Sequence, residues 1–128
     1  MKKLYVGCSL QNSSQEFRDG IDRLKAALKK NFSVIEFLGL GKGTVQDVYT
    51  YDSQCVRDCD VFLAECSKPS IGLGIEIGIA MQANKRIVAV AEKEASVSRM
   101  LQGITYQDFS FHRYTSIDEV VQLMEELV

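Results

Sequence analysis

Short apolar segments alternate regularly with segments of helical periodicity along this chain, and this alternation limits the possible folds more than any other feature. Continuous apolar runs predict five strands, at residues 3–8, 32–37, 60–65, 86–91 and 106–111. Apolar residues at helical spacing predict helices between and after them, at residues 17–28, 45–58, 73–83, 96–101 and 116–128. Residues 38–44 predict a loop and residues 68–70 a turn.

Strands that alternate with helices through short connections are typical of a parallel sheet with helices on both faces. We therefore expect one α/β domain spanning residues 1–128, a flavodoxin/Rossmann-like three-layer sandwich with strand order 2-1-3-4-5. Ligands of such sheets bind beyond the carboxyl ends of the strands, where the strand order reverses. In this chain those positions follow Cys8 and Glu65.

The composition argues against several classes of partner and cofactor. The net charge of −2 provides no basic surface for a nucleic acid polymer or an anionic membrane. No apolar run approaches the roughly 18 residues of a membrane span. The four cysteines have no Cys-x-x-Cys spacing and there is one histidine, so we expect no metal and no cofactor. Buried free thiols in a cytoplasmic protein are the simplest interpretation, with metal or redox work as the alternative.

Two glycine-rich segments resemble nucleotide-binding motifs but fail their requirements. In residues 39–44, Lys42 is followed by glycine, and Glu36 stands where a P-loop requires its first glycine. The glycines at positions 72, 74 and 78 have the wrong spacing for a dinucleotide fingerprint and follow the third strand. We therefore predict neither site.

Glu76 is the one ionisable side chain between residues 69 and 84, and isoleucine, leucine and methionine surround it. A predicted helix start near residue 73 places it close to free backbone N–H groups and the positive end of the helix dipole. One interpretation is an idle capping or solvent-facing carboxylate. The other is a carboxylate that these groups keep ionised at the mouth of the crevice, ready to attack carbon.

Glycosidic chemistry needs a second carboxylic group that serves the leaving group. Asp60 begins the third strand, at the end of the sheet away from the crevice, and a structural role is expected there. Asp52 lies on or near the preceding helix, among Tyr, Thr, Ser and Gln side chains that can hydrogen-bond a heterocycle. Taken alone, it would be a surface aspartate.

Residues 64–80, AECSKPSIGLGIEIGIA, resemble the signature of the nucleoside 2-deoxyribosyltransferase superfamily, and most closely its 2'-deoxynucleoside 5'-monophosphate N-glycosidases. Weaker likenesses at residues 5–9, 52–60 and 96–103 follow in the family's order. The resemblance implies Glu76 as the nucleophile and Asp52 as the group that protonates the departing base. It also implies substrate-binding roles for further residues: Tyr5 near the sugar 2' position, Ser9 and Ser70 at the 5' end, Gly72, Gly74, and Ser98 reaching the ligand of a neighbouring subunit in a homodimer.

The chain departs from that family in its phosphate-binding region. An arginine common after the first strand is replaced by the segment LQNSS, with Arg18 one turn further on, and a histidine after the second strand is absent. Serine hydroxyls, Asn12 and helix N-termini remain as possible phosphate ligands. Three functions stay open: hydrolysis of 2'-deoxynucleosides or their 5'-monophosphates, base exchange between deoxynucleosides, and nucleotide binding without turnover.

Overall fold

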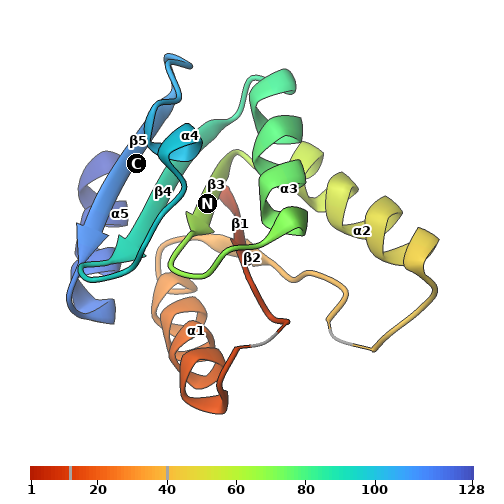
Figure 1. The fold of residues 1–128 in the computed structure, drawn as a ribbon, viewed down its shortest axis with the longest axis horizontal. Helices are drawn as coiled ribbons and strands as arrows, with labels where there is room; N and C mark the ends of the chain where they lie inside the picture. Colours follow the sequence, from red (N-terminus) through yellow and green to blue (C-terminus); the bar gives the residue numbers. More distant parts are fainter. Residues whose placement is uncertain (12, 40) are drawn as a thin grey trace.

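A computed structural model describes residues 1–11, 13–39 and 41–128 of the protein, so Asn12 and Leu40 lie outside the described residues. Its strands and helices alternate along the chain (Figure 1). In chain order they are β1 Lys3–Cys8, α1 Gln15–Leu28, β2 Ser33–Ile35, α2 Val45–Asp58, β3 Val61–Glu65, α3 Ile71–Gln82, β4 Arg86–Glu92, α4 Arg99–Gln102, β5 Phe109–Tyr114 and α5 Ile117–Leu127. No helix among the described residues is long and apolar enough to cross a membrane.

The strands form one parallel five-stranded sheet in the order β2-β1-β3-β4-β5, which confirms the predicted topology. The strand order reverses between β1 and β3, where Cys8 lies opposite Glu65. Each parallel pair requires a crossover connection, and the helices supply these crossovers. The loops after Cys8 and Glu65 therefore emerge side by side at the carboxyl edge of the sheet.

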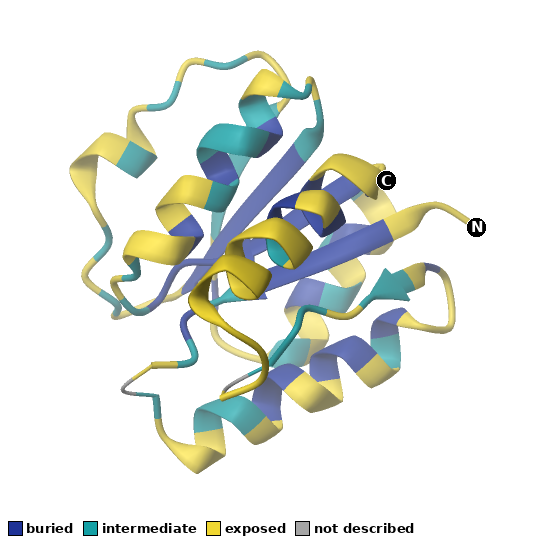
Figure 2. Ribbon diagram, turned by 90° about the vertical axis from the view of Figure 1, so that its right-hand side faces the viewer, coloured by how far each residue is buried: buried dark blue, intermediate teal, exposed yellow. Residues whose placement is uncertain are grey.

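Two apolar layers cover the two faces of the sheet. One face packs against α1 and α5, with Leu4, Leu63 and Val88 at its centre. The other packs against α2 and α3, with Phe62, Ile77 and Ala89 at its centre. The strands are mostly buried while the helices are exposed on their outer sides (Figure 2). Because buried parallel strands must be apolar on both faces, this layering explains their continuous hydrophobic runs.

Several elements differ from the expected boundaries, and β2 is shorter, at Ser33–Ile35 rather than residues 32–37. β5 spans Phe109–Tyr114 rather than residues 106–111, because residues 106–108 form a turn in which the Phe109 N–H donates to Tyr106 O. α4 begins at Arg99 rather than residue 96, after Ser98 as its N-cap. α3 begins at Ile71 rather than residue 73, because Ser70, assigned to the preceding turn, caps it by accepting a hydrogen bond from Leu73 N at 3.1 Å.

A buried carboxylate holds the carboxyl ends of β3, β4 and β5 together. Glu65 is 1% exposed and accepts hydrogen bonds from Ser67 N at 2.7 Å, Ser67 Oγ at 2.8 Å and the Tyr114 hydroxyl. Ser67 Oγ in turn accepts from Glu92 N at 2.7 Å. Burial raises the pKa of Glu65, and these donors oppose that rise. The network anchors the beginning of the loop that leads into α3.

Candidate active site

A cavity of about 630 Å³ opens at the carboxyl edge of the sheet, where the strand order reverses. Its walls come from the end of β1, the loop after it, α2, and the beginning of α3. Three of its lining residues carry the chemistry considered below: Tyr5, Asp52 and Glu76. This is the position that the strand order alone predicts for a ligand.

Glu76 is the sixth residue of α3, so its position at the helix start was predicted wrongly. The free N–H groups of a helix and most of its dipole effect are confined to the first turn. At the N-terminus of α3, the Ser70 side chain and carbonyl accept hydrogen bonds from Leu73 N and Gly74 N. The helix terminus therefore does not supply the groups that would keep Glu76 ionised.

Tyr5 supplies the hydrogen bond to Glu76 instead. Its hydroxyl donates to Glu76 Oε2 at 2.5 Å, across 71 positions of sequence. Tyr5 is 1% exposed on the interior strand β1, and its ring packs on Phe62 with the ring centroids 5.5 Å apart. A buried tyrosine hydroxyl needs a polar partner, and here that partner is the carboxylate. Among the described residues, Glu76 Oε1 has no hydrogen-bond donor, so this oxygen is free to face a ligand.

The surroundings of Glu76 raise its pKa to about 7. Burial is the largest cause, because it penalises the charged form. The hydrogen bond from Tyr5 lowers the pKa, and the neighbouring negative charge of Asp52 raises it. The same carboxylates, together with burial, raise the pKa of Tyr5 well above its ordinary value, so Tyr5 remains a donor. Glu76 is therefore partly ionised near neutral pH.

Asp52 faces the same cavity from α2. Its Oδ1 accepts a hydrogen bond from Leu38 N at 2.9 Å, which ties α2 to the segment after β2. Asp60, the other candidate, lies at the opposite end of the sheet, where its Oδ2 accepts from Lys3 N at 2.8 Å. This contact matches the structural role expected for Asp60. Two carboxylic groups, Asp52 and Glu76, thus share one cavity.

Three other predicted substrate-binding residues line this cavity: Ser9, Ser70 and Gly72. Ser9 is buried, and its hydroxyl donates to Gln11 O at 3.3 Å. The Ser70 oxygen accepts the capping hydrogen bond of α3, which leaves its proton available to a ligand. Gly72 has only Ser70 Oγ near the position of an added Cβ, at 3.9 Å, so the helix surface here is open.

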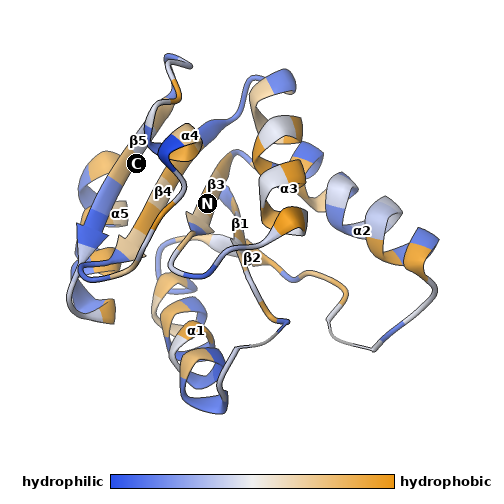
Figure 3. Cartoon of the chain, in the orientation of Figure 1, coloured by the Kyte–Doolittle hydropathy of each residue, from blue (hydrophilic) through white to orange (hydrophobic). Residues whose placement is uncertain are grey.

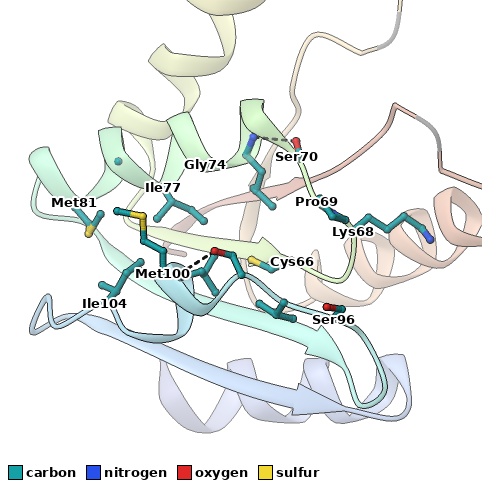
Figure 4. Close-up of a pocket in the computed structure, with 15 residues that line it drawn as sticks. Cys66, Lys68, Pro69, Ser70, Gly74, Ile77, Met81, Ser96, Met100 and Ile104 are labelled. Carbon is teal, nitrogen blue, oxygen red and sulfur yellow. Dashed lines mark hydrogen bonds between the residues drawn. The ribbon is translucent and has the colours of Figure 1, made fainter.

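Gly74 and Ser98 do not line the cavity that contains Glu76. They line a second, largely apolar cavity of about 530 Å³ between α3 and the segment around α4 (Figure 4). Pro69, Ser70 and Leu73 line both cavities, so the start of α3 separates them. Within one chain, Ser98 is therefore not brought to the carboxylates.

The sequence did not predict which residues form the apolar walls of the cavity that contains Glu76. Phe37, Val48 and Tyr49 line it with apolar and aromatic surface suited to a planar ring. Gly7 lines it where β1 passes under Phe62, and an added Cβ would lie 2.7 Å from that ring. The packing of a sheet against two helices sets these contacts, and no local pattern signals them.

No group of three or more histidine, cysteine or acidic side chains within residues 1–11, 13–39 and 41–128 is placed to hold a metal ion. All four cysteines are free thiols, and three of them are buried. Cys8 is the cysteine that lines the cavity, and burial raises its pKa to about 12, so it is not a thiolate at neutral pH. The reactive side chains of the cavity are its carboxylic groups.

Comparisons with known proteins identify the family. No family model matches the sequence. A putative 2'-deoxynucleoside 5'-phosphate N-hydrolase 1 of Thermofilum pendens is 27% identical, over 98% of this chain and 94% of that protein. A 5-hydroxymethyl-dUMP N-hydrolase of Branchiostoma floridae is 31% identical over 57% of this chain and 71% of that protein. Matches to other proteins with these names span 33% to 57% of their lengths.

Solved structures agree with the fold. The CMP N-glycosidase BcmB of Clostridium botulinum superposes with a TM-score of 0.73, at 22% identity, covering 97% of this chain and 99% of that one. A 2-desoxiribosyltransferase from Leishmania mexicana superposes with a TM-score of 0.62, at 14% identity, covering 86% and 83%. The chain is an enzyme and belongs to the family of these relatives, which are named 2'-deoxynucleoside 5'-phosphate N-hydrolase and 5-hydroxymethyl-dUMP N-hydrolase.

Proposed function

We propose that this enzyme hydrolyses the bond between nucleobase and sugar in 2'-deoxynucleoside 5'-monophosphates, with Glu76 as the nucleophile. One observation carries the proposal: the Tyr5 hydroxyl holds one oxygen of Glu76 at 2.5 Å inside the cavity, and its other oxygen has no donor among the described residues. A carboxylate fixed in this way can approach an electron-poor anomeric carbon from one direction. The N-hydrolase names of the relatives support the same chemistry.

In the first step, Glu76 Oε1 forms a bond to the anomeric carbon as the bond from that carbon to the base nitrogen breaks. The electron pair of the broken bond leaves with the base, and Asp52 acts as the general acid that gives a proton to the base. The oxocarbenium-like charge that develops on the sugar lies beside the Glu76 carboxylate, which stabilises it. The step produces free base and a deoxyribosyl ester of Glu76.

In the second step, a water molecule attacks the anomeric carbon and Asp52 takes one of its protons. The ester bond breaks, Glu76 is released as a carboxylate, and the product is 2-deoxyribose 5-phosphate. Two displacements at one carbon retain its configuration. The apolar wall formed by Phe37, Val48 and Tyr49 suits the flat base, and the buried Tyr5 ring beside Glu76 suits the sugar face that lacks a 2'-hydroxyl.

We propose further that the active form is a homodimer in the cytoplasm. Ser98 lies apart from the carboxylates within one chain, so it could serve a substrate only across an interface. Ile71 and Met100 are both 87% exposed, at the start of α3 and on α4, and a second copy would cover such apolar side chains. Four free cysteines suit a reducing compartment.

The test is product analysis by chromatography after incubation with deoxynucleosides and their 5'-monophosphates, with and without an added free base. Release of base and 2-deoxyribose 5-phosphate without an acceptor supports hydrolysis. Turnover that requires the acceptor indicates base exchange instead, the chemistry named for the Leishmania mexicana structural neighbour. Saturable binding without any turnover indicates a nucleotide-binding module and contradicts the proposal.

A further inference from the structure

The charge of the catalytic cavity poses a problem for a phosphorylated substrate. The charged groups that line it are Asp52 and Glu76, and none of its lining residues is a lysine, arginine or histidine among the positions that the structure describes. A phosphate group carries up to two negative charges near neutral pH and would be repelled by both carboxylates. A cation at the edge of this cavity would offset that repulsion.

Lys68 is placed at that edge. It lies on the loop between β3 and α3 and lines the second, apolar cavity, and the next two residues, Pro69 and Ser70, line both cavities. Its ammonium group is 5.6 Å from the centroid of the Phe17 ring on α1. Figure 4 shows the side chain extending from the loop toward α1, away from the other labelled residues of the apolar cavity. The Lys68 side chain thus reaches from the loop after β3 to α1, the helix that follows the loop after β1.

The charge of Lys68 is not neutralised by the part of the chain that the structure describes. The ion pairs there join Lys25 and Lys29 to Glu36, and Arg86 to Asp108. Arg18, the neighbour of Phe17, already donates from its terminal nitrogens to Ser13 O at 3.1 Å and Gln15 Oε1 at 3.2 Å. Among the described residues, the Lys68 ammonium has no hydrogen-bond or ion-pair partner near this edge, whereas Arg18 is partly engaged.

We infer that Lys68 binds the 5'-phosphate of the substrate and sets the enzyme's preference for nucleotides over nucleosides. This inference rests on the proposed function. A lysine ammonium is a compact charge with three donors, and proteins use it widely to bind phosphate. The interaction with the Phe17 ring restricts the flexible Lys68 side chain before the ligand binds, which reduces the conformational entropy lost on binding. Ser70, two residues further on, adds a hydroxyl donor from the same loop.

The experiment compares kcat/KM for one deoxynucleoside 5'-monophosphate with kcat/KM for the matching deoxynucleoside. The wild-type enzyme is expected to favour the monophosphate, and Lys68→Gln is expected to reduce the ratio of the two values by about tenfold or more. Lys68→Arg keeps the charge and should retain most of the preference. Lys42→Gln is the matched control, because Lys42 is an exposed lysine beside Gly41, which lines the opposite rim.

An unchanged ratio in Lys68→Gln, a comparable fall in Lys42→Gln, or a wild-type enzyme that does not favour the monophosphate would overturn the inference. A second readout separates it from the proposed function. Inorganic phosphate should raise the Tm of the wild-type protein more than that of Lys68→Gln, whether or not either protein turns over. If the wild-type enzyme cleaves neither substrate, the proposed function fails, and this difference in Tm still decides whether Lys68 binds phosphate.

Discussion

The hydroxyl of Tyr5 donates a 2.5 Å hydrogen bond to Glu76 Oε2 and thereby connects the interior strand β1 with the middle of α3. The two residues lie on different elements, so the hydrogen bond forms only when α3 packs against the sheet. The bond orients the carboxylate and opposes the effect of burial, which raises the pKa of Glu76 to about 7. The ionisation of Glu76 near neutral pH is thus a property of the packing of α3 on the sheet.

Removal of the Tyr5 hydroxyl should change the pH dependence of catalysis. In the wild-type enzyme, kcat/KM is expected to rise with pH through about 7, as Glu76 loses its proton. In Tyr5→Phe the ionised form loses its donor, so the pKa of Glu76 rises further and the acid limb should move upward by about one unit or more. An acid limb at the same pH in both proteins would show that this hydrogen bond does not control the ionisation.

The same group should make stability depend on pH. The pKa of Glu76 is about 7 in the folded protein, above its ordinary value of 4.5, so between these values the folded state holds more protons than the unfolded state. Stability therefore falls as pH rises through this window, by at most about 3 kcal/mol. Glu76→Gln removes this loss and keeps an acceptor for Tyr5. Its Tm should exceed that of the wild type at pH 8 and approach it at pH 5, as measured by thermal unfolding; a pH-independent difference would contradict the assignment.

Asp52→Asn tests the protonation of the leaving base. Asparagine keeps the shape and an oxygen that can accept from Leu38 N, so the 2.9 Å contact should survive. Because asparagine cannot transfer a proton, kcat should fall most for substrates whose bases are poor leaving groups. The measurement is kcat across a series of substituted bases. An equal loss with every base would exclude Asp52 as the acid.

Gly7 and Gly78 give a matched pair for the packing beneath the site. A Cβ at Gly7 would lie 2.7 Å from the Phe62 ring and 3.0 Å from Leu73 Cδ1, so Gly7→Ala should lower the free energy of unfolding by about 1–3 kcal/mol. No atom lies within 4 Å of a Cβ at Gly78, in the interior of α3. Gly78→Ala should therefore be neutral or stabilising by up to about 1 kcal/mol. Equal changes in the free energy of unfolding of the two variants, measured with urea, would contradict this difference in packing between Gly7 and Gly78.

Much of the fold follows from local pattern. Parallel strands buried on both faces require continuous apolar runs, and these runs located all five strands and their order. The last strand was misplaced by three residues, because the polar residues Ser110, His112 and Arg113 interrupt its hydrophobic run. The start of α3 was misplaced because Ser70 can serve equally in a turn or as an N-cap.

The sequence indicated the main residues of the candidate site, but it did not indicate how they contact one another. The lone glutamate of an apolar, glycine-rich segment pointed to Glu76, and the need for a second carboxylic group pointed to Asp52 or Asp60. The family resemblance favoured Asp52 and added Tyr5. The hydrogen bond between Tyr5 and Glu76 depends on the distance between β1 and α3, which tertiary packing sets. Lys68 gave no signal, because a lysine in a loop is ordinarily a solvated surface residue. Its position over Phe17 became evident only in three dimensions (Figure 4).

The apolar residues of α3 lie on two faces of the helix, one buried and one exposed, and the sequence does not distinguish them. The helix carries hydrophobic or neutral residues over most of its length (Figure 3). Leu73, Ile77 and Ala80 pack against the sheet, whereas Ile71 and Ile75 remain exposed. The inner residues stabilise the fold of one chain. The outer residues are available for the homodimer proposed above, and the oligomeric state in solution can be measured by sedimentation.

The most direct test of the central claim is kcat/KM of Glu76→Ala, measured by release of free base from a deoxynucleoside 5'-monophosphate, with circular dichroism to verify the fold. Since Glu76 is proposed to form the covalent bond to the sugar, we predict a loss of several orders of magnitude in a folded protein. Retention of more than about a tenth of the wild-type value would contradict the account, because the reaction would then proceed without the proposed nucleophile.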